Sequence, residues 1–254
     1  MNISLITATY NSVETIADTI DSVRNQNIDN LEYIIIDGNS NDGTLEIIKQ
    51  NNDVVTKFIS ESDKGIYDAL NKGLKISTGD IIGFLHSDDY YTHNLVLSEI
   101  KDIFENQNID FLYGDLQYVT SDIPPKIFRH WNSGNFILSN LKKGWMPPHP
   151  TVYFKKSLIE KIGYFDTSFN ISADYDWLIR CLTIPEIKVA YIPKVLIKMK
   201  MGGKSNKSIK NILKKSKEDY KIIKKNKIGG IYTIFLKNFC KINQFLFCKS
   251  KIII

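Results

Sequence analysis

The first hundred residues alternate between short apolar runs and amphipathic segments, and this alternation constrains the fold more than any other feature. Four runs are typical of buried strands: 3–7, 31–36, 54–60 and 80–85. Between them, segments that start near residues 12, 44 and 66 have the spacing of amphipathic helices. This repeated order predicts an α/β fold with a doubly wound, mostly parallel sheet flanked by helices.

The chain beyond residue 100 is less regular. A helix is predicted over 171–182, and candidate strands lie at 110–113, 115–120, 187–191 and 195–199. From about residue 206 the sequence is rich in lysine and helical in spacing, with a break at Gly229 and Gly230. We therefore predict one domain over residues 1–205 and a helical basic extension over residues 206–254.

The charge of the chain is divided near the same place. Residues 194–251 carry 17 lysines and two acids, whereas the rest carries 16 basic and 26 acidic residues. A basic tail on an acidic body indicates a polyanionic partner, and we prefer a membrane surface to a nucleic acid. The alternative is a bias toward Lys, Asn and Ile without any partner.

Composition excludes several classes of protein. With 43% hydrophobic and 24% charged residues, the chain resembles folded globular proteins and not disordered or collagen-like ones. Its three cysteines lack CxxC spacing, which argues against a disulfide scaffold or a cysteine zinc cluster and favours a reducing compartment. The sequence has no secretory signal and no run of 18 apolar residues, so we expect no bilayer-spanning segment.

Acidic side chains follow three of the predicted strands. Asp37 ends the second strand, Asp63 follows the third, and Asp88 and Asp89 follow the fourth. Because the carboxyl ends of parallel strands meet at one edge of a sheet, we expect these side chains to share one crevice. Crowded carboxylates repel one another, so the pattern favours a metal or ligand site over isolated turn residues.

Asp88 and Asp89 are the candidate metal ligands. Mg²⁺ and Mn²⁺ prefer oxygen ligands and commonly bridge a carboxylate to substrate phosphates. The strand-to-helix turns contain neither GxGxxG nor GxxxxGK[ST], which argues against a dinucleotide oxidoreductase or a P-loop enzyme. A nucleoside diphosphate held mainly through metal fits what remains, and the alternative is a solvated turn.

Four motifs in order, TATYNS, IIIDGNSNDGT, SDKGIYDALNKG and STGDIIGFLHSDDYY, resemble the family 2 inverting glycosyltransferases of the GT-A fold over residues 1–100. A weaker resemblance continues through MPPHPTVYFKK and ISADYDWLIR to about residue 200. It implies transfer of a sugar from a nucleotide donor, usually a UDP-sugar, to an acceptor hydroxyl with a divalent metal. Residues 1–100 would form the nucleotide-sugar half and residues 101–205 the acceptor half.

The resemblance also implies roles for individual residues. Thr7, Tyr10 and Asp37 would lie near the nucleotide base, and Asp63 would lie in the same donor pocket. Asp88 and Asp89 would handle the ribose, the metal and the diphosphate. His86 stands where the family often has an acid, which leaves open which aspartate binds metal directly and whether His86 contributes.

The catalytic base is expected in ISADYDW. The family frequently has Glu-Asp here, and only the aspartate, Asp174, carries over. At the first turn of a helix the dipole would favour its anionic form, and it could accept the proton of the acceptor hydroxyl. Asp176 is the second candidate, and capping of the helix after Ser172 is the structural alternative for Asp174.

Other residues have open roles at this stage. His149, in PPHPT, is an acceptor-site or a structural residue; Trp145 and Trp177 are core residues or sugar platforms; Lys72 and Arg180 are solvated or offset diphosphate charge.

A basic tail in a family member of this kind suggests surface polysaccharide synthesis, such as O-antigen or capsule, on a lipid-linked acceptor at the cytoplasmic face of the plasma membrane. Ile231, Phe235, Phe239, Ile242 and Leu246 form a helical stripe suited to the membrane interface, and the alternative is that this stripe packs on the catalytic domain. The alternatives for the protein are a sugar-1-phosphate nucleotidyltransferase and a non-catalytic nucleotide-sugar-binding subunit. The sequence specifies neither the donor sugar nor the linkage.

Overall fold

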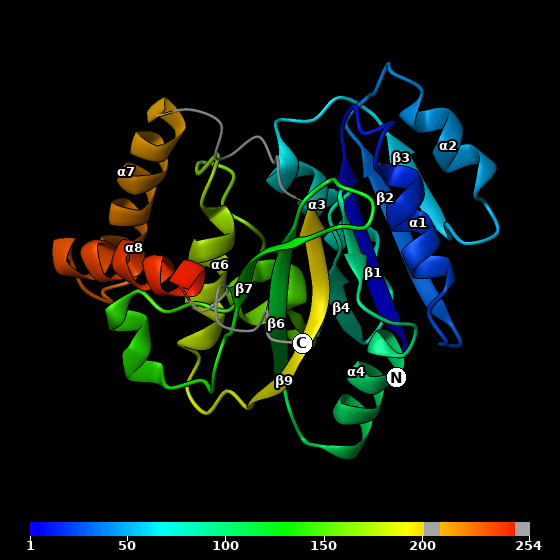
Figure 1. The fold of residues 1–254 in the computed structure, drawn as a ribbon. Helices are drawn as coiled ribbons and strands as arrows, with labels where there is room; N and C mark the ends of the chain where they lie inside the picture. Colours follow the sequence, from blue (N-terminus) through cyan, green and yellow to red (C-terminus); the bar gives the residue numbers. More distant parts are fainter. Residues whose placement is uncertain (201–208, 247–254) are drawn as a thin grey trace, which may run out of the picture.

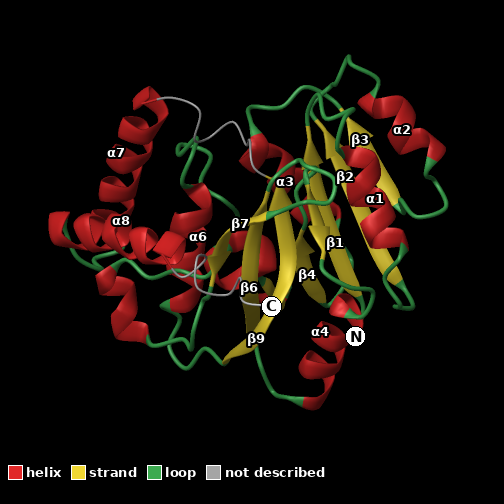
Figure 2. Ribbon diagram, viewed as in Figure 1, coloured by secondary structure: helices red, strands yellow, loops and turns green. Residues whose placement is uncertain are grey.

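A mixed sheet runs through the middle of the molecule and is covered by helices on both faces (Figures 1 and 2). The computed structural model describes residues 1–200 and 209–246. Its strands are β1 (Ile3–Thr9), β2 (Leu31–Asp37), β3 (Lys57–Ser60), β4 (Ile81–Phe84), β5 (Asp89–Tyr91), β6 (Phe111–Val119), β7 (Ile127–Trp131), β8 (Tyr153–Lys155) and β9 (Val189–Lys200). Its helices are α1 (Ile16–Arg24), α2 (Thr44–Gln50), α3 (Ile66–Ile76), α4 (Val96–Asn106), α5 (Ser157–Ile162), α6 (Ala173–Leu182), α7 (Ile209–Lys225) and α8 (Ile231–Leu246), with 3₁₀ turns η1 (Leu138–Lys143) and η2 (His149–Thr151).

The first half of the sheet is parallel, in the order β3-β2-β1-β4. Alternate residues of β1 face opposite sides: Ile6 and Ala8 belong to the apolar cluster that includes α3, and Ile3 and Leu5 to the one that includes α1. Both faces of the strand are therefore buried, which explains the near-continuous apolar runs. The predicted α/β fold is confirmed.

The second half of the sheet is mixed rather than parallel. β8 pairs antiparallel with both β4 and β6, β9 pairs parallel with β6, and β5 adds antiparallel to β9. The predicted strands at 110–113 and 115–120 form one strand, β6, with an irregular register at Gly114. Those at 187–191 and 195–199 likewise form one strand, β9, again with a shifted register against β6. The sequence patterns that predicted two strands in each case correspond to irregular register within one strand.

The two C-terminal helices pack at one end of the molecule, beside α6, β7 and η1, at the left of Figure 1. Ile222, Ile223 and Ile228 are buried in the same apolar cluster as α3 and α6. In the described residues, no helix combines the length and the apolar character needed to cross a membrane.

Candidate functional site

Tyr10, Gly38 and Asp63 lie together where β1, β2 and β3 end. A side chain at Gly38 would come within 2.7 Å of Asp63 Oδ2 and 3.3 Å of the Tyr10 ring. Asp63 Oδ1 accepts a hydrogen bond from the Gly65 amide at 2.8 Å, and the Tyr10 side chain is half-exposed. Because residue 38 has no side chain, the half-exposed ring of Tyr10 and the carboxylate of Asp63 can both lie at this corner of the sheet edge.

Asp37 lies next to this corner but is completely buried. Its carboxylate accepts hydrogen bonds from the Ser60 hydroxyl at 2.6 Å, the Ser40 amide at 3.0 Å and the Ser40 hydroxyl. In this structure Asp37 therefore fixes the loop after β2 to the end of β3, which shapes the corner.

The structure does not bring Thr7 to the same corner. Thr7 is completely buried within β1, and its hydroxyl donates to the Leu85 carbonyl at 2.7 Å and lies 3.1 Å from the Tyr33 hydroxyl. The side chain sits two residues before the end of β1 and supports the loop after β4 from inside the domain. The expected place of Thr7 on the first strand is confirmed, and its role near the nucleotide base stays a prediction.

Asp88 and Asp89 differ sharply in their surroundings. Asp88 is half-buried in the turn between β4 and β5, whereas Asp89 starts β5 and is completely buried. Neither carboxylate oxygen of Asp89 has a hydrogen-bond partner within the described part of the chain. Burial, with a smaller contribution from the charge of Asp88, raises the pKa of Asp89 well above its ordinary range.

These two residues fit a divalent cation that is shared with substrate. An orphaned buried carboxylate beside a half-exposed one supplies hard oxygen donors, and Mg²⁺ typically takes only one or two carboxylates when substrate phosphates complete its shell. Among the side chains that the structure describes, no three or more His, Cys, Asp or Glu groups gather around one point. The carboxylates of Asp88 and Asp89 suit a metal whose other ligands come from a diphosphate.

His86 and His149 stack beside this pair, with ring centroids 5.9 Å apart. His149 is buried and also stacks on Phe84 at 5.0 Å. Burial lowers the pKa of His149 to about 4, against the opposing charge of Asp174, and His86 lowers it further. Burial also lowers the pKa of His86, which is opposed by the charges of Asp88 and Asp174. Both rings are therefore neutral at neutral pH.

Asp174 lies in the first turn of α6 and is partly exposed. The Tyr67 hydroxyl, on α3, shares its proton between Asp174 Oδ1 at 3.0 Å and the Ile171 carbonyl at 2.8 Å. Burial, and then the charge of Asp174, raises the pKa of Tyr67 well above its ordinary value. Tyr67 is thus a fixed donor to this carboxylate, and Asp174 keeps a second oxygen that no described hydrogen bond occupies.

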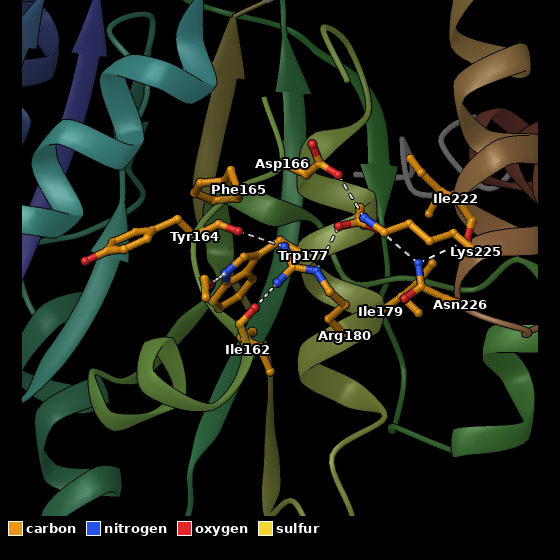
Figure 3. A network of polar contacts seen from close by, with 12 residues as sticks. Ile162, Tyr164, Phe165, Asp166, Trp177, Ile179, Arg180, Ile222, Lys225 and Asn226 are labelled. Carbon is orange, nitrogen blue, oxygen red and sulfur yellow. Dashed lines mark hydrogen bonds and ion pairs between the residues drawn. The ribbon is translucent and has the colours of Figure 1, made fainter. Parts of the chain in front are cut away.

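Asp176, the second candidate for the base, has a structural role instead. It is completely buried and paired with Arg180 at 2.8 Å and Lys225 at 3.2 Å, and it accepts a hydrogen bond from Asn226 at 3.0 Å. These three partners are labelled in Figure 3. The same guanidinium donates to the Ile162 and Tyr164 carbonyls. Arg180 is therefore committed to Asp176 and is not available to a diphosphate.

The remaining open roles also become structural. Trp177 is completely buried and its indole donates to the Gly163 carbonyl at 3.1 Å; the Trp145 indole donates to Ser133 and packs on Tyr113. Lys72 is paired with Glu61 at 2.8 Å.

Tyr118 on β6 was missed by sequence reasoning. Burial raises the pKa of Tyr118, the charge of Arg129 opposes this, and the charges of Asp89 and Asp174 add to it. The Arg129 guanidinium carbon lies 4.9 Å from the Tyr118 ring centroid and 5.2 Å from that of Trp131. Their β6–β7 hairpin carried no recognisable motif, and only the strand register links it to β5: Met199 of β9 pairs with both Asp89 and Tyr118.

Known proteins are similar to this chain in sequence. The model of glycosyl transferase family 2 matches residues 4–165. A Mycobacterium bovis protein named "PGL/p-HBAD biosynthesis glycosyltransferase" is 29% identical over 208 residues, which are 80% of this chain and 78% of the relative.

Solved glycosyltransferases share the fold. Staphylococcus aureus TarS residues 1–349, in complex with UDP-GlcNAc, superposes with a TM-score of 0.70 at 18% identity. The Pyrobaculum calidifontis mannosyltransferase PcManGT, in complex with GDP-Man and Mn²⁺, superposes with a TM-score of 0.63 at 16% identity. These matches cover 89% and 88% of this chain, which spans 65% and 63% of those chains. On the family match, this chain belongs to glycosyl transferase family 2.

Proposed function

We propose that the protein transfers a sugar, with inversion, from a nucleoside diphosphate donor to an acceptor hydroxyl, and that Asp174 is the base. The observation that carries this proposal is a continuous run of side-chain contacts between the two candidate groups. The ring of His86, two residues before Asp88, stacks on His149 at 5.9 Å, His149 contacts Phe165 at 5.7 Å, Phe165 contacts Tyr67 at 5.6 Å, and the Tyr67 hydroxyl donates to Asp174 at 3.0 Å. These contacts support a site in which a metal-ligand candidate and a base candidate from opposite halves of the chain act on one substrate. An inverting displacement needs this arrangement, with the diphosphate and the base on either side of the sugar.

Asp174 accepts a proton and Tyr67 orients Asp174 in the reaction that we propose. The acceptor oxygen attacks the anomeric carbon, the bond between that carbon and the diphosphate oxygen breaks, and the hydroxyl proton moves to Asp174. Tyr67 holds one carboxylate oxygen and leaves the other for the acceptor. General base catalysis of this kind typically contributes about 10²–10⁴ in rate.

Asp88 and Asp89 would hold Mn²⁺ or Mg²⁺, which supplies charge neutralisation for the departing diphosphate. Asp88 is the direct-ligand candidate because it is the partly exposed member of the pair, and Asp89 lies behind it. PcManGT, a protein of the same fold, was solved in complex with GDP-Man and Mn²⁺, which supports the use of a divalent metal.

For the donor we propose a UDP-sugar. The corner formed by Tyr10, Gly38 and Asp63 combines an exposed ring for stacking with a carboxylate for hydrogen bonding, which suits a nucleoside. TarS, a protein of the same fold, was solved with UDP and with UDP-GlcNAc.

For the acceptor we propose a lipid-linked saccharide reached from an anionic membrane surface. Ile231, Phe235 and Phe239 on α8 are 75%, 65% and 53% exposed, so this part of the predicted stripe does not pack on the catalytic domain. The side chains of Ile242 and Leu246 lie outside the described residues. The opposite face of α8 is anchored by Thr233 and Lys237, which are buried.

The charge of α7 matches such a surface. Its 17 residues contain seven lysines and two acids, and both acids, Glu218 and Asp219, are buried. The exposed face of the helix is consequently basic, next to an exposed aromatic helix. This combination favours an anionic bilayer, which attracts each nearby lysine by about 1 kcal/mol.

The proposal is tested by incubating the full chain with UDP-sugars, Mn²⁺ and a lipid-diphosphate-saccharide acceptor and by determining the anomeric configuration of the product by NMR. The expected result is a glycoside of inverted configuration and loss of turnover on chelation. A retained configuration would refute Asp174 as a simple base. Binding of UDP-sugar without any transfer would support a non-catalytic binding subunit.

A further inference from the structure

A buried carboxylate on α7 holds the segment that leads into α6. Glu218 is only 7% exposed, and its carboxylate accepts hydrogen bonds from three consecutive amides: Asn170 at 3.2 Å, Ile171 at 2.9 Å and Ser172 at 3.0 Å. Lys214 and Lys221 stand four residues before it and three after it on the same helix, yet neither forms an ion pair with it in the described residues. Glu218 is turned inward, onto the backbone.

Burial of a carboxylate costs free energy unless both of its oxygens accept hydrogen bonds. Removing a carboxylate from water costs several kcal/mol, and here backbone amides, not a counter-ion, offset that cost. Because the acceptor is an anion, the hydrogen bonds are of the stronger, charge-assisted kind. Glu218 is therefore a specific clamp on residues 170–172.

The clamped segment lacks support from its own side chains. Ser172 precedes α6, but its side chain makes no capping hydrogen bond, and its hydroxyl has no partner within the described structure. From the opposite side the segment is held by Tyr67, which donates to the Ile171 carbonyl and to Asp174. Asp174 thus follows, by two residues, a turn that is fixed from α7 and α3.

A second contact fixes the other side of Asp174. Two residues further on, Asp176 is bound by Lys225 and Asn226 at the end of α7 (Figure 3). Helix α7 therefore grips the start of α6 both before and after Asp174. Since both grips come from more than 40 residues further along the chain, the position of Asp174 depends on the C-terminal extension.

We propose that Glu218 is a positioning residue for glycosyl transfer: by holding the amides of residues 170–172 it sets the position of Asp174. The proposal rests on the function proposed above. It makes α7 part of the catalytic apparatus, in addition to any contact with a membrane. Displacement of a reacting group by about 1 Å can cost about 10²-fold in rate, so loss of the clamp should affect turnover much more than donor binding.

The test compares Glu218→Ala and Glu218→Gln with Glu160→Ala, at an exposed glutamate on α5, in the full-length chain. Amide hydrogen exchange at residues 170–172, kcat, the KM for the UDP-sugar and UDP affinity are measured for each. For Glu218→Ala we expect exchange at these amides to rise at least about tenfold and kcat to fall by about 10²-fold. The KM for the donor and the UDP affinity should stay unchanged, and Glu160→Ala should behave as wild type.

Glu218→Gln retains one acceptor oxygen, so its kcat should lie between those of Glu218→Ala and the wild type. If Glu218→Ala does not fold, Glu218→Gln still allows the test. Unchanged exchange at residues 170–172 in both variants would overturn the clamp. Faster exchange with unchanged kcat would overturn its positioning role. A wild-type protein that transfers no sugar would refute the proposed function, while the exchange experiment would still report on the clamp.

Discussion

The two halves of the candidate site are held in different ways. On the donor side, Asp37 ends β2, and Asp63 and Asp88 come soon after β3 and β4, so the parallel strands place all three at the same edge of the sheet. On the acceptor side, Asp174 depends on a tyrosine 107 residues earlier and a helix more than 40 residues later. Strand register can be inferred from a local pattern, whereas contacts between distant helices cannot, and this difference separates what the sequence predicts well from what it does not.

The largest difference in stability is expected between variants of Asp174 and Asp176, each substituted in turn by asparagine. Asp176→Asn removes the buried partner of Arg180 and Lys225 and should lower the free energy of unfolding by about 3 kcal/mol, measured by urea denaturation. Asp174→Asn should change it by less than about 1 kcal/mol, since Asp174 is partly exposed and loses one neutral donor. Equal losses in the two variants would contradict the division between structural and reactive acid.

The donor side is tested through Asp88. Asp88→Asn should reduce kcat/KM by about 10²–10³-fold and remove most of the stimulation by Mn²⁺, while thermal unfolding stays unchanged because the side chain is half-exposed. The corresponding Asp89→Asn variant tests its role behind the first ligand: we expect a similar loss of metal stimulation. Wild-type stimulation in Asp88→Asn would exclude Asp88 as the ligand.

His149, which is buried between the two halves of the site, should make the stability of the protein depend on pH. The folded protein keeps His149 neutral down to about pH 4, whereas its ordinary pKa in the unfolded chain is 6.5. Its contribution to stability is therefore complete above pH 6.5 and is lost as the pH falls from 6.5 to 4, by up to about 3 kcal/mol. His149→Phe should be less sensitive to pH over this range in chemical denaturation, because a phenyl ring takes up no proton beside His86 and Asp174. An identical pH dependence in the variant would mean that another group is responsible.

The smallest effect is expected at the periphery, on α8. Phe235→Ser should weaken flotation with vesicles that contain anionic lipid by about tenfold, and kcat on a short soluble acceptor should not change. Phe58→Ser, at an exposed aromatic on β3, is the matched control and should float as wild type. Equal flotation of wild type and Phe235→Ser would remove α8 from the membrane contact.

Physical reasons account for what the sequence did and did not predict. Strands β1 to β4 were predicted correctly because strands buried on both faces contain long apolar runs. The positions of Asp63 and Asp88 near the ends of β3 and β4 could be inferred from those strands. The sequence pattern did not distinguish Asp88 from Asp89, since exposure of adjacent residues depends on the pairing of β5 with β9. Glu218 lay within a Lys-rich helix that resembled a solvated face, and only the packing of α7 shows that it points inward.

Single-turnover kinetics of Asp174→Asn test whether Asp174 takes the proton of the acceptor hydroxyl. With UDP-sugar and Mn²⁺ bound, we expect a transfer rate lowered by about 10²–10⁴-fold, with UDP-sugar affinity equal to that of wild type. A transfer rate within a few-fold of wild type at equal donor occupancy would contradict it.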